Sequence, residues 1–207
     1  MTSNKQLIES YDKIAKDWHK DHQQDDWWIE GTNKFISLLE PGDLVLDVGC
    51  GSGTKAKYLE DQHIKVIGID FSKEQIEIAK KVSPKSEFSI MDLKDANNLK
   101  FTFNGVFAQA VLLHIPRKDI KKTIATITHN LEKNGYVYIA VKEKKPGRGE
   151  EEIRIENDYG YTYKRFFSYF TIEEILKTLR DLRFETVWQN IKPSGNTRWI
   201  GVIAKKQ

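Results

Sequence analysis

The chain has 207 residues, a length that suits one domain with a substantial hydrophobic core. Hydrophobic residues make up 39% and charged residues 30%, which is typical of globular proteins and unlike disordered chains. The 33 basic and 30 acidic side chains leave a net charge of +3, and this near balance argues against a general nucleic-acid-binding surface. The single cysteine, Cys50, excludes an internal disulfide and a cysteine-based zinc site.

The N-terminus shows no secretory signal pattern, and no apolar run approaches the length of a membrane span. We therefore expect a cytoplasmic protein without membrane contact, as a monomer or weak homodimer. His19 and His22 lie close together, but no third ligand accompanies them, so we predict no metal site.

Five short, β-rich apolar runs alternate with amphipathic stretches over the first two thirds of the chain. The runs cover residues 44–48, 65–69, 87–91, 105–110 and 136–141, and the helical patterns cover 54–61, 73–81 and 117–133. This alternation predicts a parallel sheet with helices on both faces, because right-handed crossovers return each helix to the sheet. Ligands of such sheets bind at the carboxyl ends of the strands.

The pattern changes after residue 141. Residues 142–148 are basic and Glu150, Glu151 and Glu152 are acidic, which favours a solvent-exposed excursion that pairs its own charges. An aromatic and basic cluster follows.

The last part of the chain predicts a helix at 171–182 that opens with a Thr171–Glu174 capping box. Two closing strands, at 184–191 and 198–204, are joined by a loop with Pro193 and form an antiparallel hairpin. We therefore predict an α/β fold with a Rossmann-like, doubly wound, seven-stranded sheet that is mostly parallel.

A glycine-rich loop, residues 47–53, follows the first predicted strand, and Thr54 opens the next helix. Gly51 and Gly53 are expected where the backbone approaches a ligand closely. The glycines alone indicate only a nucleotide-type ligand, because similar loops serve nicotinamide and flavin enzymes. The loop lacks the longer final gap of the dinucleotide fingerprint, and the Asp47 carboxylate disfavours a pyrophosphate and suits a cationic amino acid group.

The next two predicted strands also end in acids. Asp70 is placed to accept hydrogen bonds from both hydroxyls of a ribose. Asp92 is placed to accept from an exocyclic adenine amine, while Phe71 and Met91 cover the faces of the ring. Each acid alone could be a surface turn residue, but their joint placement favours a nucleoside-containing cofactor.

These segments resemble the motifs of the class I S-adenosylmethionine-dependent methyltransferases of the small-molecule type. The matching segments are residues 46–53, 67–72, 91–92 and 110–116. The resemblance, best over residues 4–142, implies S-adenosyl-L-methionine as cofactor, S-adenosyl-L-homocysteine as product and a small-molecule acceptor. The cofactor-binding residues expected are Asp47, Gly49, Cys50, Gly51, Gly53, Asp70, Phe71, Met91, Asp92 and Gln109. Asn104 departs from the Asp of many relatives, at a strand start far from the expected site.

Two residues are catalytic candidates. His114 follows the fourth strand, where it could be a general base or a substrate contact, or only cap the turn before Pro116. Tyr11 lies in a segment that resembles a helix over the cofactor in related enzymes, whereas Trp18 in that segment is expected to pack in an amphipathic stripe. Cys50 is interpreted as a small buried side chain rather than a nucleophile.

The acceptor side is expected to combine aromatic and basic residues. Trp27 and Trp28 should point in different directions, one into the core and one into the pocket. The acceptor residues expected are Tyr11, Trp28, His114, Tyr163, Arg165 and Tyr169. We expect one domain with an N-terminal helical cap at 1–40, a cofactor-binding core at 41–142, a lid-like insertion at 143–170 and a closing helix and hairpin at 171–207.

The predicted reaction is a direct displacement at the activated methyl group. Because a sulfonium is a good leaving group, the protein contributes mostly alignment and exclusion of water, and a base matters only if the acceptor must lose a proton early. Two alternatives stay open. Residues 11–15 and 165–169 resemble methyltransferases of tRNA wobble uridines, although the charge balance weighs against RNA binding. A non-catalytic cofactor-binding module is also compatible with the fold.

Overall fold

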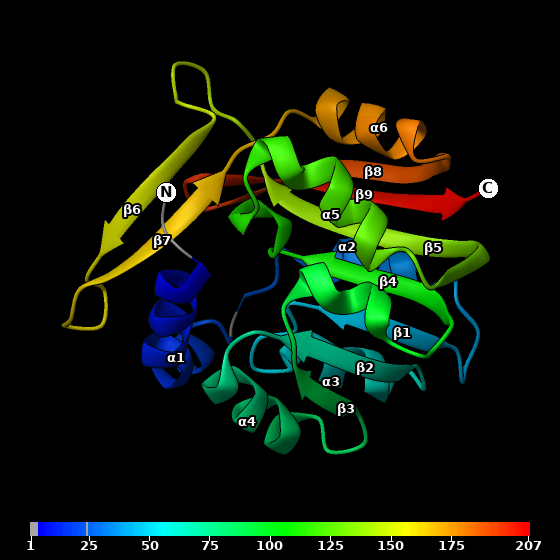
Figure 1. Ribbon diagram of the computed structural model, residues 1–207, viewed down its shortest axis with the longest axis horizontal. Coiled ribbons are helices and arrows are strands. Elements are labelled where there is room, and N and C mark those ends of the chain that lie inside the picture. Colours follow the sequence, from blue (N-terminus) through cyan, green and yellow to red (C-terminus); the bar gives the residue numbers. More distant parts are fainter. Residues whose placement is uncertain (1–3, 24) are drawn as a thin grey trace.

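A single mixed sheet organises the computed structural model, which describes residues 4–23 and 25–207. Its seven strands follow the order β3-β2-β1-β4-β5-β9-β8 (Figure 1). The strands are β1 Leu44–Val48, β2 Lys65–Asp70, β3 Glu87–Ile90, β4 Phe103–Gln109, β5 Leu131–Lys142, β8 Phe184–Ser194 and β9 Thr197–Lys206. The first five are parallel to one another and β9 is antiparallel to both β5 and β8, which confirms the predicted doubly wound sheet.

Helices cover both faces of this sheet. The helices are α1 Asn4–Asp21, α2 Ile29–Ile36, α3 Thr54–Asp61, α4 Lys73–Val82, α5 Ile120–Ile127 and α6 Ile172–Asp181. Alternate strand residues serve opposite faces, so Leu46 packs with the α5 and α6 side chains, while Val45 packs with those of α2 and α3. The alternating helices and strands thereby bury a core on each side of the sheet.

The helix predicted at 117–133 is too long. A 3₁₀ turn at Arg117–Asp119 leads into α5, which ends at Ile127, and Leu131 already belongs to β5, where it pairs with Phe103. Leu131 fits the helical spacing of the preceding apolar residues only because it is buried, as they are. The ladder then shifts before Gly105, so the first residues of β5 form an irregular start to the strand.

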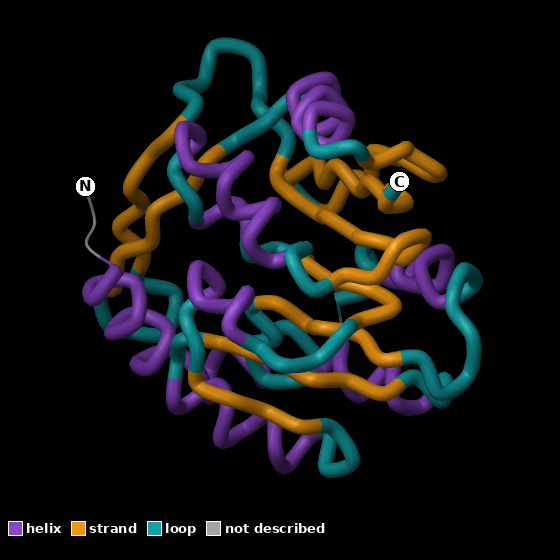
Figure 2. Tube along the Cα trace, turned by 45° about the vertical axis from the view of Figure 1, so that its right-hand side comes forward, coloured by secondary structure: helices purple, strands orange, loops and turns teal. Residues whose placement is uncertain are grey.

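The insertion at 143–170 contains a separate two-stranded antiparallel sheet that the sequence interpretation did not predict. Its strands are β6 Glu151–Glu156 and β7 Tyr163–Ser168. In Figure 1 this hairpin projects from one end of the main sheet and lies beside α1, and Figure 2 shows the same neighbourhood from another side. Contacts between α1 and both β7 and α4 make α1 the bridge between the insertion and the core.

Two further predictions about local structure hold. The closing strands β8 and β9 form the expected hairpin but are longer than predicted, since Pro193 pairs with Arg198 inside it and the turn lies at Gly195 and Asn196, with Gly195 in the left-handed region at φ +52. Asn104 lies at the start of β4, where its side-chain oxygen accepts from the Leu44 amide at 2.8 Å and its Nδ2 donates to Glu132 at 2.7 Å. This departure from many relatives therefore serves strand packing. Among the described residues, no helix has the length and apolar character to cross a membrane.

Candidate functional site

A cavity of about 460 Å³ lies at the carboxyl ends of the central strands. One side is formed by the ends of β1, β2 and β4 and the loops that follow them. The other side is formed by α1, the 3₁₀ turn Leu112–His114, the end of β5 and the insertion. The cavity therefore has a half built from the sheet and a half built from segments added around it.

The three glycines after β1 all have positive φ but serve different purposes. A Cβ on Gly49 would come within 2.4 Å of the Val111 side chain, and one on Gly53 within 2.9 Å of the Ala79 Cα. Gly51 is different, since the nearest atom to its Cβ would be 3.9 Å away and the residue lines the cavity. The expected close approach to a ligand therefore applies to Gly51, whereas Gly53 lies outside the cavity lining and packs α3 against α4.

Asp47, the penultimate residue of β1, lines the cavity with only 3% of its surface exposed. Its Oδ2 has no hydrogen-bond partner in the described part of the chain. Burial raises the pKa of Asp47 to about 7, although the nearby Lys55 ammonium opposes this shift. Lys55, on α3, also lines the cavity, and burial lowers its pKa. A buried carboxylate with a free oxygen is a site for a cationic ligand group.

Asp70 ends β2 and fixes the glycine loop in place. Its carboxylate accepts hydrogen bonds from the Gly51 amide at 3.0 Å and the Ser72 amide at 2.9 Å. Burial raises its pKa to about 6, and these two amides act in the opposite direction. Asp70 thus positions the loop as well as lining the cavity.

The remaining predicted cofactor residues also border the cavity. They are Cys50, Phe71, Met91, Asp92 and Gln109. Burial raises the pKa of the Cys50 thiol, which agrees with its interpretation as an unreactive buried side chain. Neither amide atom of Gln109 has a partner among the residues described, and the same holds for Oε1 of Gln75. Gln75 was missed from the sequence because it lies inside α4 with no motif to mark it.

These observations fit an adenosyl amino acid. The cavity offers an unpaired carboxylate oxygen at Asp47, unpaired amide groups at Gln109 and an open backbone edge at Gly51. Asp70 at the end of β2 and Asp92 just after β3 border the same space. The donors and acceptors present match an ammonium group, ribose hydroxyls and an adenine amine.

Helix α1 covers the cavity and is tied to the sheet side at two points. The Ser72 hydroxyl donates to Asp12 at 2.6 Å, and His19 Nδ1 lies 2.9 Å from the Ser52 hydroxyl oxygen in the glycine loop. Trp18 lines the cavity, so the sequence interpretation of this residue as part of a packing stripe was incomplete.

Tyr11 and His114 meet at the cavity wall. The Nδ1 of His114 donates to the Phe166 carbonyl at 2.7 Å, so its Nε2 accepts the Tyr11 hydroxyl proton at 2.6 Å. Burial, aided by the charges of Arg165 and Lys142, lowers the pKa of His114 to about 3. Burial also raises the pKa of Tyr11. Both groups are therefore neutral near pH 7.

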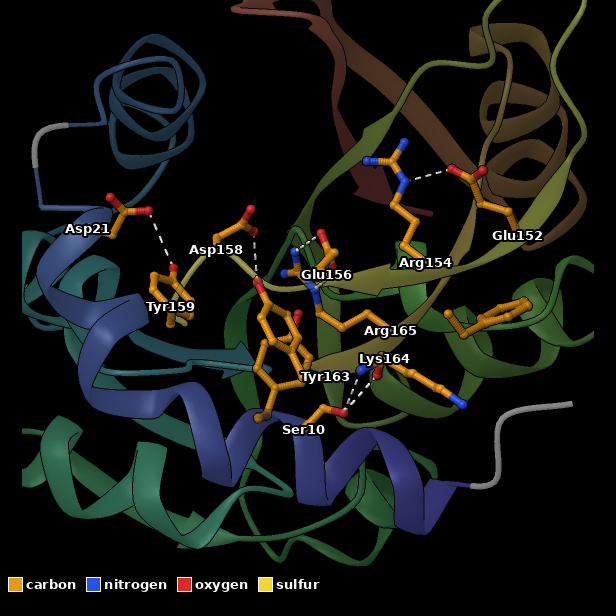
Figure 3. Close-up of polar contacts among 12 residues, drawn as sticks. Ser10, Asp21, Glu152, Arg154, Glu156, Asp158, Tyr159, Tyr163, Lys164 and Arg165 are labelled. Atoms are coloured by element: carbon orange, nitrogen blue, oxygen red, sulfur yellow. Dashed lines mark hydrogen bonds and ion pairs between the residues drawn. The ribbon is translucent and has the colours of Figure 1, made fainter. Parts of the chain in front are cut away.

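Arg165 reaches the cavity from β7 although it is 6% exposed. Two of its guanidinium nitrogens donate to the Glu156 carboxylate at 2.7 and 2.6 Å, as Figure 3 shows. Its charge also lies 4.6 Å from the ring centroid of Trp18. Glu156 neutralises this buried cation, and Arg165 links the insertion to α1.

Three residues predicted for the acceptor side lie outside the cavity lining. Trp28 is buried against Tyr58, and it is Trp27 that lines the cavity, which corrects the choice between the two neighbours. Tyr163 donates to Asp158 at 3.0 Å and Tyr169 donates to Glu152, so both hydroxyls are engaged within the insertion. These partners come from the β6–β7 hairpin, which the sequence interpretation did not include.

The position of Lys142 contradicts the prediction that the whole basic segment is exposed to solvent. It is the last residue of β5 and lines the cavity, while Lys144 and Glu150 form a self-paired contact of the expected kind at 2.8 Å. Burial lowers the pKa of Lys142 to about 8. Within residues 4–23 and 25–207, no cluster of three His, Cys, Asp or Glu side chains could hold a metal ion.

A doubly wound sheet with a glycine turn and acids at successive strand ends defines an α/β protein of the nucleotide-cofactor class. The family described as "Methyltransferase domain" matches residues 45–135. This match, together with curated relatives and solved structures that are themselves methyltransferases, confirms the resemblance to class I S-adenosylmethionine-dependent methyltransferases seen in the sequence.

Several curated proteins are similar in sequence to part of this chain. A phosphoethanolamine N-methyltransferase from Triticum aestivum is 29% identical over 166 residues, which cover 77% of this chain and 32% of that protein. A ubiquinone biosynthesis O-methyltransferase from Pelagibacter ubique is 28% identical, with 68% of this chain and 66% of that protein covered. The chain thus spans about a third of the length of the wheat enzyme.

Solved structures share the fold. The 1,6-didemethyltoxoflavin-N1-methyltransferase of Burkholderia thailandensis, solved with 1,6-didemethyltoxoflavin and S-adenosylhomocysteine, has a TM-score of 0.76 at 19% identity. The match covers 97% of this chain and 87% of that one, so the insertion and α1 are included in the comparison.

Proposed function

We propose that this protein binds S-adenosyl-L-methionine and transfers its methyl group to a small-molecule acceptor, with release of S-adenosyl-L-homocysteine. The observation that carries the proposal is the buried Asp47 carboxylate, with one oxygen unpartnered among the described residues, beside the open Gly51 backbone. The match of residues 45–135 to the methyltransferase domain family supports the choice of cofactor. The relatives named for small-molecule acceptors support the acceptor class.

The residues at the sheet side would hold the cofactor. Asp47 would bind the ammonium of the methionine portion, and Lys55 its carboxylate. Asp70 would accept from the ribose hydroxyls and Asp92 from the adenine amine, with Phe71 against the ring. Met91 and Gln109 complete this set. The bound cofactor supplies an activated methyl group on a good leaving group.

The chain itself contributes position and exclusion of water. Helix α1 closes over the cavity through Asp12 and His19, which shields the methyl group from hydrolysis. Tyr11 and His114 hold one another in fixed orientation at the cavity wall, with the shared proton on Tyr11 Oη. A neutral histidine whose pKa is near 3 is a weak base at pH 7, so this pair acts by orienting the acceptor.

Calorimetry tests the cofactor half of the proposal. We expect S-adenosylmethionine and S-adenosylhomocysteine each to bind at one site per chain, and Asp70→Ala to weaken both. Absence of heat with either ligand at about 1 mM would refute the proposal. Unchanged binding by Asp70→Ala would remove the ribose assignment.

Product release tests the acceptor half. Incubation with labelled cofactor and a panel of small amines, phenols, carboxylates and thiols should yield S-adenosylhomocysteine with at least one class. A parallel incubation with unfractionated tRNA is expected to give no labelled RNA and no salt-dependent binding, since the charge balance provides few phosphate contacts. Labelling of tRNA would refute the small-molecule acceptor and support tRNA as the acceptor.

A further inference from the structure

The ammonium group of Lys142 faces the acceptor side of the cavity. Its Nζ lies 4.3 Å from the ring centroid of Phe167 and 5.6 Å from that of Trp199, and all three residues line the cavity. In the described ranges this Nζ has these two ring contacts but no ion pair and no side-chain hydrogen bond. Aromatic rings compensate a desolvated cation only in part, and three N–H donors remain to be satisfied.

The charges around Lys142 are otherwise balanced. Arg154 on β6 and Arg165 on β7 both act on it, and each guanidinium has its own carboxylate partner, Glu152 at 2.7 Å and Glu156 at 2.6 Å. Figure 3 shows these two pairs side by side on the insertion. The glutamates are therefore committed to the arginines.

The remaining neighbour of Lys142 does not neutralise it either. His114 is uncharged, because its Nδ1 donates to a carbonyl and its Nε2 accepts from Tyr11. Both His114 and Lys142 line the cavity, and the charge of Lys142 contributes to the lowered pKa of this histidine. A partly buried cation in such surroundings stabilises a ligand anion.

We propose that Lys142 recognises the methyl acceptor, and that this acceptor carries a carboxylate or phosphate monoester bound by Lys142 Nζ beside an apolar or aromatic body. The inference deepens the proposed function and rests on it. The flat wall of the cavity next to Lys142 suits such a body, since the rings of Trp27 and Trp199 stack with centroids 3.9 Å apart and planes 6° from parallel. A neutral analogue would leave the ammonium without a partner, which costs affinity.

Benzoate, phenyl phosphate and benzamide test this proposal as probes, with tryptophan fluorescence as the readout. The titrations are run with and without saturating S-adenosylhomocysteine, so the anion preference is measured independently of cofactor binding. We expect at least one of the two anions to bind at least about 10-fold more tightly than benzamide. The anion with the higher affinity shows whether the site recognises a carboxylate or a phosphate.

Three variants assign the preference to Lys142. Lys142→Met should reduce the preference for the anion to less than about 2-fold, and Lys142→Arg should retain most of it. Lys144→Met, an equal change in net charge at a self-paired lysine, should keep the full preference. Circular dichroism and Tm establish that each variant is folded.

Equal binding of benzoate, phenyl phosphate and benzamide by the unaltered protein would overturn the proposal, as would an unchanged preference in Lys142→Met. Failure of all three probes to bind at about 10 mM would also overturn it. Failure of S-adenosylhomocysteine alone to bind would instead refute the proposed function, because the anion titrations do not require it.

Discussion

The two halves of the cavity are built in different ways. On the sheet side, the Gly51 amide bonds to an Asp70 carboxylate only 19 residues away, across a single strand–helix–strand unit. On the acceptor side, Tyr11 bonds to His114 across 103 residues and Ser10 to the Lys164 carbonyl across 154. Figure 3 shows the latter contact joining α1 to β7. The cofactor half therefore depends on local crossovers, whereas the acceptor half exists only when distant segments dock.

The largest expected effect concerns Asp47 in the cofactor half. Asp47→Asn keeps the shape of the side chain but removes the charge proposed to bind the ammonium, so we expect S-adenosylhomocysteine affinity to fall about 100-fold. Calorimetry measures this change. Asp61→Asn, at an exposed ion pair on α3, is the matched control and should bind normally. Equal affinities of the two variants would show that Asp47 is not part of the cofactor site.

The next effect concerns stability of the acceptor half. In the Arg165–Glu156 pair the side chains are 7% and 16% exposed, so Glu156→Gln leaves a buried guanidinium without its counter-charge. We expect a loss of about 2 kcal/mol of unfolding free energy, measured by urea denaturation. Glu77→Gln, whose partner Lys80 is 52% exposed, should change stability by less than about 0.5 kcal/mol. A similar small loss in both variants would contradict this interpretation of the pair.

Cofactor binding should also depend on pH. Because burial raises the pKa of Asp47 to about 7, protonation removes its charge as the pH falls through that value. Affinity for S-adenosylhomocysteine should be level above about pH 7.5 and fall by up to about tenfold per pH unit below about pH 6.5. Protonation of Asp70, with a pKa of about 6, adds to the loss at lower pH.

Calorimetric titrations of the unaltered protein and Asp47→Asn provide the measurement. Between about pH 6.5 and 8 the variant should lack the pH dependence, since it has no carboxyl group to titrate at this position. A level profile of the unaltered protein over this range would disprove the assigned role of Asp47.

The smallest effect concerns the contact between α1 and the acceptor half. Tyr11→Phe removes the hydroxyl that donates to His114 Nε2, at a cost of about 1 kcal/mol in unfolding free energy. Amide hydrogen exchange should become faster in α1, while the glycine loop after β1 keeps its protection. Tyr58→Phe, which removes an exposed hydrogen bond to Asn33, is the control. Equal acceleration in the glycine loop would show that the two halves are not independent.

Sequence patterns predicted the sheet well because its signals are local. The central strands and the turn at Gly195 were identified from short apolar runs and turn residues. The helix predicted to extend to 133 failed because the buried Leu131 satisfies helical spacing and strand burial equally. The β6–β7 hairpin was missed because burial in it does not follow residue type: Ile153 and Ile155 of β6 are exposed, whereas the charged Arg165 of β7 is buried.

The residues of the site also differ in how well the sequence could predict them. The acids and glycines of residues 47–92 could be read from their positions at strand ends, and the cavity includes Asp47, Asp70 and Asp92. The sequence could not predict that Trp27 rather than Trp28 lines the cavity, because neighbouring residues with the same side chain differ only in what packs against them. Gln75 and Lys142 carried no motif and enter the cavity only through the placement of α4 and β5.

The amino-acid sequence by itself determined the chain order of the main-sheet strands, the resemblance to methyltransferases and the acids and glycines of the cofactor half of the cavity, because these depend on periodicity and turn chemistry within short segments. Tertiary structure alone decided the acceptor half. There the environment of each group, such as the carboxylate that neutralises Arg165 and the missing counter-charge at Lys142 among the described residues, is supplied by segments far away in the chain. Burial and charge pairing are properties of that assembly, so no local pattern encodes them.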